Sequence, residues 1–421
     1  LLTLAFFQVS SYAQTNSDQR TLTTRIADLL AQFPAQDSKQ LNSTMQEIGQ
    51  LGEQGYITLI SGLSAPGRGN NASLEYAIGG YCAYVMQNSK EKERATSVKA
   101  YCTALEKASD KQVKEFIISQ LEIVGKDDAV NCLQQYLTDW QLADPASRAL
   151  VKINTPAAKS AMNNALASSQ GLAKLSIIEA LGLSRTTAAV PALNQLASSA
   201  DPNVAKVALS ALANIADPSS ATVLSAAAQK TSYYFDNNNA TAALIVYADN
   251  LLKDGNNALA ETTIKQLHQE ARANNQVHVR TAALNILSRV IKTDASTMLI
   301  GAMDDKDMVY RAAALKFAAP LVNAENTPLW LNKLSKADHE TKTQIIDMLA
   351  QTGAKETLPA MVKLLKNKDE NLRIAAINGV ASIGQAAVIP DLYKVMRKGD
   401  STTISAVTTS LLRMKGDGIS Q

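Results

Sequence analysis

The sequence predicts an all-α protein, a right-handed α-solenoid of stacked antiparallel helix pairs. Gly and Pro together make up about 7% of the 421 residues, where average usage would give roughly 12%, so turns are scarce. The chain is 46% hydrophobic but only 5% aromatic, and it is rich in Ala rather than in the residues that fill strands. A chain this long outgrows one compact core, and a repeat of fixed period favours a core that extends along one axis.

The charge balance does not imply a strongly basic or acidic partner. The chain has 41 Lys and Arg residues against 38 Asp and Glu residues, a formal net charge of +3. Proteins that bind nucleic acid through their overall charge are far more basic. We therefore expect no nucleic-acid partner.

The first residues do not belong to the predicted solenoid. Residues 1–7 (LLTLAFF) are apolar but too short to span a bilayer, and Ser11 and Ala13 are small residues at the two positions that a signal peptidase requires. We interpret residues 1–13 as a signal-peptide remnant. This predicts an extracytoplasmic protein, periplasmic or secreted, although a frayed apolar terminus of a cytosolic protein is the alternative. No later stretch is expected to be long and apolar enough for a transmembrane helix.

A repeat of constant period occupies the C-terminal part of the chain. Arg280, Arg311, Lys342 and Arg373, which we call the basic ladder, follow one another at equal steps along the sequence, and the last three follow an Asp by four. The same Asp-to-basic spacing occurs further upstream. The full set of these positions is Asp110, Lys114, Asp144, Arg148, Arg280, Asp307, Arg311, Asp338, Lys342, Asp369 and Arg373.

Each marker has a physical role at a helix end. An Asp at the start of a helix accepts a hydrogen bond from a free N–H group and interacts favourably with the helix dipole. Apolar residues then follow on one face, as at Ala376, Val380 and Ile383. In four units a Pro follows the basic position at one constant distance, as Pro390 follows Arg373, and it suits the first turn of a second helix. Each unit is therefore predicted to be two antiparallel helices.

This pattern resembles the HEAT repeat family, in the short-unit form also seen in bilin lyases. The residues that carry the resemblance in the last full unit are the acidic start Asp369, the apolar-basic pair Leu372-Arg373, the Ala-rich first helix and Pro390. The resemblance covers residues 170–230, 274–415 and 110–168, and it extends weakly over 38–109. It implies an α-α superhelix of the armadillo-like kind that binds proteins and serves as a scaffold.

The resemblance and the spacing together divide the chain into segments. After residues 1–13 we expect weakly repeat-like helical units over 14–109 and HEAT-like repeats over 110–235. Residues 236–273 are expected to form an irregular, longer helical hairpin, because the repeat markers on either side of it stand more than two periods apart. HEAT-like repeats resume over 274–421, and the last unit, which starts at Asp400, is expected to be incomplete.

The basic ladder has a structural and a functional interpretation. Stacked units would align its four residues in a row, where they could bind a ligand. We instead expect acidic groups at helix starts of the same or the adjacent unit to engage each basic side chain and so tie neighbouring repeats together.

The cysteines offer one candidate disulfide. Cys82 and Cys102 are equidistant from Lys92 in the polar turn between two apolar helices, so the sequence suggests a bond between them. The alternative is that both are buried free thiols. Cys132 is then left over and is expected in the core.

Two other groups of residues are candidates for a site. Tyr233, Tyr234 and Phe235 lie at the entrance to the irregular hairpin, where an exposed loop would present aromatic rings to a ligand, unless the rings pack under the longer helices. The only histidines, His268, His278 and His339, have no metal-ligand spacing and are expected to be solvated. No catalytic residue, metal site or cofactor site is predicted.

The sequence thus favours a non-catalytic, extracytoplasmic scaffold that binds a protein or extended ligand on its concave face. The alternative is a HEAT module of a longer secreted enzyme, possibly carbohydrate-processing, whose catalytic domain would follow Gln421. A bilin lyase or other cytosolic HEAT protein is a third interpretation, which conflicts with the signal-peptide remnant.

Overall fold

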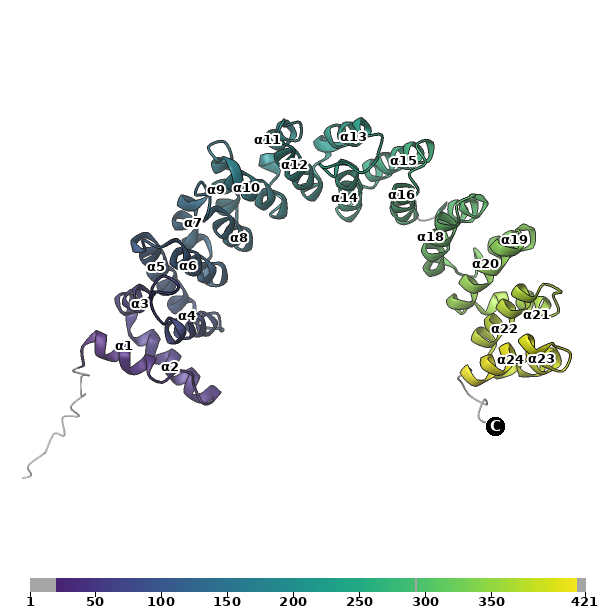
Figure 1. Cartoon of the computed structure of the whole chain (residues 1–421), viewed down its shortest axis with the longest axis horizontal. Coiled ribbons are helices and arrows are strands. Elements are labelled where there is room, and N and C mark those ends of the chain that lie inside the picture. The colour runs from purple at the N-terminus through teal and green to yellow at the C-terminus, as the bar shows by residue number, and fades with distance from the viewer. Residues whose placement is uncertain (1–19, 292–293, 415–421) are drawn as a thin grey trace, which may run out of the picture. The chain divides into compact units, whose positions relative to one another are not determined.

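The computed structural model describes residues 20–291 and 294–414, and all regular structure in these ranges is helical. The predicted signal-peptide remnant, residues 1–13, lies outside the described residues. The chain divides into two compact units that meet between Ser184 and Arg185, a division that the sequence analysis did not predict. Figure 1 shows both units as successions of short helices.

The first unit contains ten α-helices in the described residues. They are α1 (Leu22–Leu30), α2 (Ser38–Gln50), α3 (Gly52–Ser61), α4 (Ala72–Val85), α5 (Glu91–Lys107), α6 (Lys111–Val124), α7 (Asp127–Leu133), α8 (Ala143–Ile153), α9 (Pro156–Leu166) and α10 (Gly171–Leu183).

The second unit continues the same alternation. Its α-helices are α11 (Val190–Leu196), α12 (Pro202–Ile215), α13 (Ala221–Lys230), α14 (Ala240–Lys253), α15 (Asn257–Ala273), α16 (Val277–Val290), α17 (Ala295–Gly301), α18 (Met308–Ala318), α19 (Thr327–Lys336), α20 (His339–Thr352), α21 (Leu358–Leu364), α22 (Glu370–Gly384), α23 (Ile389–Met396) and α24 (Ser401–Arg413). The 3-10 helix η5 (Ala302–Asp304) follows α17 directly.

Within each unit the helices form two rows (Figure 1). In one row every helix packs on the helix two places further along the chain. We call the members of this row the first-row helices. They are α2, α4, α6, α8 and α10 in the first unit and the even-numbered helices α12 to α24 in the second. The helices between them are the second-row helices. This two-row stack confirms the predicted solenoid of helix pairs.

The helix ends follow the predicted rules. Asp307, Asp338 and Asp369 each accept a backbone hydrogen bond at the start of a first-row helix. Second-row helices α19, α21 and α23 each carry a Pro at their second residue, where the missing N–H costs little. Gly353 ends α20 with φ +68°, a left-handed conformation that glycine adopts without strain.

The core of the second unit runs between the rows. Trp330 of second-row helix α19 is completely buried, as are Ile345, Ile346 and Leu349 of first-row helix α20. Gly379 of α22 lets two rows approach closely, because a Cβ atom there would lie 2.9 Å from Met361 Sδ and 3.3 Å from Ala350 Cβ. Each repeat therefore buries its apolar face only by packing on its neighbours.

The hairpin predicted over residues 236–273 consists of α14 and α15, with 14 and 17 residues. By contrast, second-row helices α17 and α21 have 7 residues each. The departure from the constant repeat spacing in this region therefore coincides with a longer second-row helix, α15.

One stretch, Glu370–Met396, is long and apolar enough to cross a membrane by length and composition alone. The expectation that no stretch passes this test was therefore wrong. The same residues form α22, a 3-10 turn and α23, and half of the apolar window is buried inside the protein. Core helices of globular proteins have the same properties.

The two tryptophans give a matched test of this packing. Replacing the buried Trp330 with Ala should cost about 3–5 kcal/mol in the free energy of unfolding of the second unit, because it leaves a cavity between the rows. The same change at Trp140, whose residue is 64% exposed, should cost less than about 0.5 kcal/mol. Urea unfolding followed by circular dichroism measures both, and equal losses would contradict the two-row core.

Candidate functional site

Four of the five predicted Asp positions are helix caps in the structure. The side chains of Asp110, Asp307, Asp338 and Asp369 each accept a hydrogen bond from the backbone N–H three residues later, at 3.1, 2.9, 2.8 and 2.9 Å. Asp144 instead lies inside the first turn of α8. The acidic part of the pattern therefore marks the start of first-row helices.

Arg311 connects two repeats. It is only 7% exposed, and its Nη1 donates to the carbonyl oxygens of Asp305 and Lys306 just before its own helix, at 3.0 and 3.3 Å. Its Nη2 lies 3.1 Å from Glu340 Oε2, in the first turn of the next first-row helix, α20. One guanidinium thus binds the turn before its own helix and also the start of the next first-row helix.

Arg373 makes the same kind of connection between α22 and α24. Its Nη1 donates to the carbonyl oxygen of Asn367 at 3.0 Å. Its Nη2 donates to Asp400 Oδ2 at 3.1 Å, and its Nε donates to Thr403 Oγ1 at 2.9 Å. Asp400 caps α24 through the Thr403 N–H, and this hydrogen bond, with the Arg373 charge, lowers the pKa of Asp400.

Arg280 also contacts the next repeat but uses an aromatic ring in addition. Its Nη2 lies 2.8 Å from Asp305 Oδ1, and its guanidinium carbon is 3.7 Å from the centroid of the Tyr310 ring. Although burial opposes ionisation of Asp305, the Asp307 backbone N–H and Arg280 lower its pKa. The stacking on Tyr310 adds a cation–π interaction to the ion pair.

The remaining basic positions differ. Lys342 has no ion pair with any residue in the described ranges, and Asn371 stands one period after Glu340, the partner of Arg311. Lys114 binds the Tyr136 hydroxyl at 3.2 Å instead of a carboxylate. Arg148 pairs with Asp144 at 3.4 Å within its own helix, and both side chains are exposed. Three members of the basic ladder thus connect repeats, and Lys342 does not.

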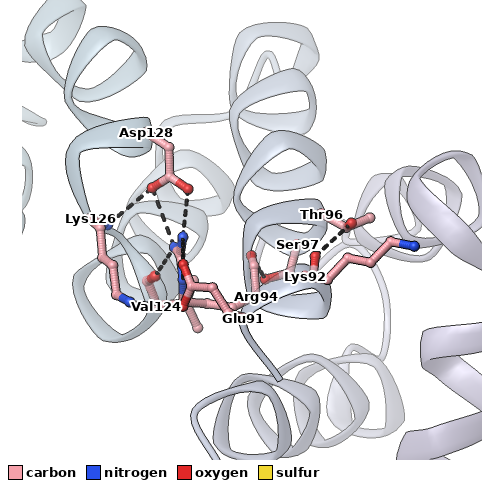
Figure 2. Close-up of polar contacts among 8 residues, drawn as sticks. All are labelled: Glu91, Lys92, Arg94, Thr96, Ser97, Val124, Lys126 and Asp128. Atoms are coloured by element: carbon pink, nitrogen blue, oxygen red, sulfur yellow. Dashed lines mark hydrogen bonds and ion pairs between the residues drawn. The ribbon is translucent and has the colours of Figure 1, made fainter. Parts of the chain in front are cut away.

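Arg94 in the first unit makes the same kind of bridge and was missed by the sequence analysis (Figure 2). It is 4% exposed, and its guanidinium donates to Glu91 Oε1 in its own helix and to the Val124 carbonyl oxygen, both at 2.8 Å. It also donates to both carboxylate oxygens of Asp128 at the start of α7, at 3.3 and 2.8 Å. Hydrogen bonds from Arg94 and Lys126 lower the pKa of Glu91 to about 2.

A sequence signal for Arg94 existed. Arg94 follows the N-cap residue Lys90 by four, which is the spacing of the basic ladder. It was overlooked because a Lys, rather than an Asp, occupies the cap position.

The disulfide joins Cys102 to Cys132, not Cys82 to Cys102 as predicted. Cys102 on α5 and Cys132 on α7 lie on adjacent second-row helices, 30 residues apart in sequence and with Cα atoms 5.6 Å apart, within the usual range for a disulfide. Cys82 is a free, buried thiol whose Sγ lies 2.8 Å from the Tyr101 hydroxyl. Burial raises its pKa to about 12. The prediction paired cysteines within one hairpin, whereas the repeat period brings equivalent positions together.

The aromatic loop after α13 presents only two of its three rings. Tyr234 and Phe235 are 53% and 88% exposed, but Tyr233 is 3% exposed. Ser232 and Tyr233 have φ values of 51° and 62°, and this left-handed turn directs the backbone so that Tyr233 packs inward. Tyr233 is therefore a packing residue, while Tyr234 and Phe235 stay available for contact.

His268 is not a solvated surface histidine, contrary to the expectation. Its Nε2 lies 2.6 Å from the Tyr310 hydroxyl, and burial together with Arg280 and Arg272 lowers its pKa to about 4. His278 and His339 are exposed as expected. Among the described residues, no group of three or more His, Cys, Asp or Glu side chains is placed to hold a metal ion.

Open grooves lie between successive first-row helices. In the first unit a groove of about 400 Å³ is lined from α6, α8 and α10 by residues that include Glu122, Arg148, Glu179 and Leu183. In the second unit a groove of about 540 Å³ between α20 and α22 is lined by Glu340, Asp347 and Asp369, among others. Burial raises the pKa of Asp347. Both grooves are lined by charged and apolar side chains together.

Arg373 and Lys342 provide a matched test of the bridging role. Replacing Arg373 with Ala should cost about 1–3 kcal/mol in the free energy of unfolding of the second unit, because several hydrogen bonds from a largely buried guanidinium are lost. Lys342→Ala, at the equivalent position but without a bridge, should cost less than about 0.5 kcal/mol. Urea unfolding compares the two, and equal small losses would assign the ladder to another role.

Comparison with known proteins identifies the repeat. A family model for HEAT repeats matches residues 164–245 and 327–413, whereas no curated protein sequence matches the chain. Human deoxyhypusine hydroxylase in complex with glycerol is similar over 68% of this chain and 95% of its own, with 14% identity and a TM-score of 0.25.

Structures of Kap121p bound to Pho4p and to Nup53p align over 93% and 92% of this chain, both with 14% identity and a TM-score of 0.42. The chain spans about half of Kap121p, 50% and 49% in the two structures. These scores are too low to assign a function. Residues 164–245 and 327–413 of this chain are HEAT repeats.

Proposed function

We propose that this chain is an extracytoplasmic, non-catalytic scaffold that binds a protein through the faces of its first-row helices. The observation that carries the proposal is the pair of open grooves between successive first-row helices, one in each unit. Stacked repeats bury their apolar faces against one another, so the outward faces of a row are free to vary with the ligand.

Exposed apolar side chains on the first row support a protein partner. Ile123 of α6, Leu183 of α10 and Val246 of α14 are 49%, 57% and 42% exposed. Charged residues flank Leu183 in the groove of the first unit. A polar rim around apolar contacts is typical of protein–protein interfaces.

The Cys102–Cys132 disulfide supports the location outside the cytoplasm. Disulfides persist in oxidising compartments and are rare where glutathione and thioredoxin keep thiols reduced. The bond agrees with the interpretation of residues 1–13 as a signal-peptide remnant, which is independent of it.

The location predicts the state of the three thiols. In protein isolated from its source under alkylating conditions, non-reducing peptide mapping should find Cys102 linked to Cys132 and Cys82 alkylated only after unfolding. The same preparation, analysed by mass spectrometry, should give a mature chain that begins at Gln14. Three free thiols and an intact residue 1–13 segment would place the protein in a reducing compartment.

The binding face can be mapped by a photo-crosslinking amino acid introduced at single positions in living cells. We expect discrete protein adducts at the first-row positions Ile123, Leu183 and Val246. The control positions are Trp140 and Leu329, which are 64% and 47% exposed but lie outside the first row. Adducts at the controls and none at the first-row positions would contradict the proposal.

A further inference from the structure

A second groove in the second unit differs from those of the first row because its lining is strongly basic. It has a volume of about 690 Å³ and lies between the turn that joins α21 to α22 and the turn that joins α23 to α24. Lys366, Lys368, Arg397 and Lys398 line it from these two turns. All four residues are exposed, and none has a carboxylate partner among the described residues.

The basic residues recur with the repeat. Lys333 and Lys336, Lys363 and Lys366, and Lys394 and Arg397 form three pairs of equal internal spacing, and each pair follows the previous one by a repeat period to within one position. The first member is neutralised in two pairs, because Lys333 binds Asp304 and Lys394 binds Asp391. The second members remain without a carboxylate partner in the described part of the chain.

Helix-dipole stabilisation accounts for only part of this charge. Basic residues in the last turn of a helix interact favourably with its C-terminal end, which explains Lys363 and Lys394. Lys366, Lys368 and Lys398 come after the last residues of α21 and α23, and the dipole effect falls off within the last turn. Their concentration around one groove therefore leaves a local positive charge that nothing in the described fold neutralises.

The floor of the groove is apolar. Leu365 is 2% exposed and Val395 is partly buried. Gly399 lets its backbone pack closely against Thr403, since a Cβ atom at Gly399 would lie 2.6 Å from Thr403 Cγ2. No aromatic residue lines the groove, so it lacks the stacking platform that single-stranded nucleic acids use. Apolar contact flanked by free cations fits a chain that alternates carboxylate and apolar side chains.

We infer that this groove, which we call the basic groove, binds an acidic, partly apolar peptide segment of a protein partner. The inference rests on the proposed scaffold function and adds a second contact region to it. Carboxylates of the peptide would pair with Lys366, Lys368, Arg397 and Lys398, while its apolar side chains would contact the partly buried Val395. Such pairing steers encounter and selects the partner by charge.

The test uses a fluorescein-labelled peptide of four Asp-Leu-Glu repeats and measures fluorescence anisotropy at about 0.15 M salt, where the Debye length is about 8 Å. Wild-type protein should bind it, and the neutral Asn-Leu-Gln version should bind at least about tenfold more weakly. The quadruple variant Lys366→Glu, Lys368→Glu, Arg397→Glu, Lys398→Glu should also lose at least about tenfold in affinity.

A matched control separates the groove from the total charge. Lys206, Lys230, Lys316 and Lys355 are exposed lysines of the same unit outside the groove, and their reversal to Glu changes the net charge equally. This control should bind the peptide within about twofold of wild type, since distant surface charges are screened. Replacement of the four groove residues by Gln removes their charge without reversing it, so it should weaken peptide binding less than replacement by Glu. The circular dichroism spectrum should stay unchanged.

Three outcomes would overturn the inference: no binding of the acidic peptide by wild type, equal losses in groove and control variants, or displacement of the peptide by oligothymidine at similar concentration. The last would indicate a nucleic-acid site. Photo-crosslinks at Ile123, Leu183 and Val246 report on the scaffold separately. If those adducts form while the peptide fails to bind, only the basic groove is excluded.

Discussion

Several neighbouring repeats are tied together by arginines that belong to one repeat and bind the start of another. Arg311 shows the arrangement most fully, because it donates to the carbonyl oxygens before its own helix and lies 3.1 Å from Glu340 of the next. A repeat of two short helices cannot bury its apolar face alone. Apolar packing supplies most of the attraction but has little direction, whereas a guanidinium fork fixes how far and at what angle the next helix begins.

The Asp caps and the positions of the arginines could be predicted from the sequence, but the carboxylate that each arginine binds could not. An Asp cap depends on backbone groups two and three residues away, so its spacing is visible along the chain. The partner of each arginine depends on the neighbouring repeat, and it varies: Asp305 precedes the cap, Asp400 is the cap, and Glu340 follows it by two residues. A fixed period therefore located the arginines but not their carboxylates.

The same distinction explains the errors. The Cys82–Cys102 pairing assumed contact within one hairpin, while the bond between Cys102 and Cys132 joins successive second-row helices. For Tyr233 the sequence left exposure and packing both open, and a left-handed turn at Ser232 and Tyr233 buries the ring. His268 was expected in solvent because Tyr310, which binds it, lies 42 residues away in sequence. For Cys102 and His268 the deciding contact is long-range.

The basic residues that bridge repeats differ from those that line the basic groove. Bridging cations are buried and paired, whereas Lys366, Lys368 and Arg397 occupy similar turn regions, are exposed and have no carboxylate partner among the described residues. The acidic lining of the groove between α20 and α22 and the basic groove lie in the same unit. Two grooves of opposite charge in one unit would bind segments of opposite charge in a partner.

The central claim, that arginine bridges couple neighbouring repeats, is tested most directly by a double-mutant cycle on Arg94 and Asp128. Urea unfolding of wild type, Arg94→Met, Asp128→Asn and the double variant gives the coupling free energy. The bridge predicts that the two single losses together exceed the loss in the double variant by about 1–2 kcal/mol, within the range found for residues in direct contact. Losses that add within about 0.3 kcal/mol would show that the two side chains contribute independently and that this bridge does not couple its two repeats.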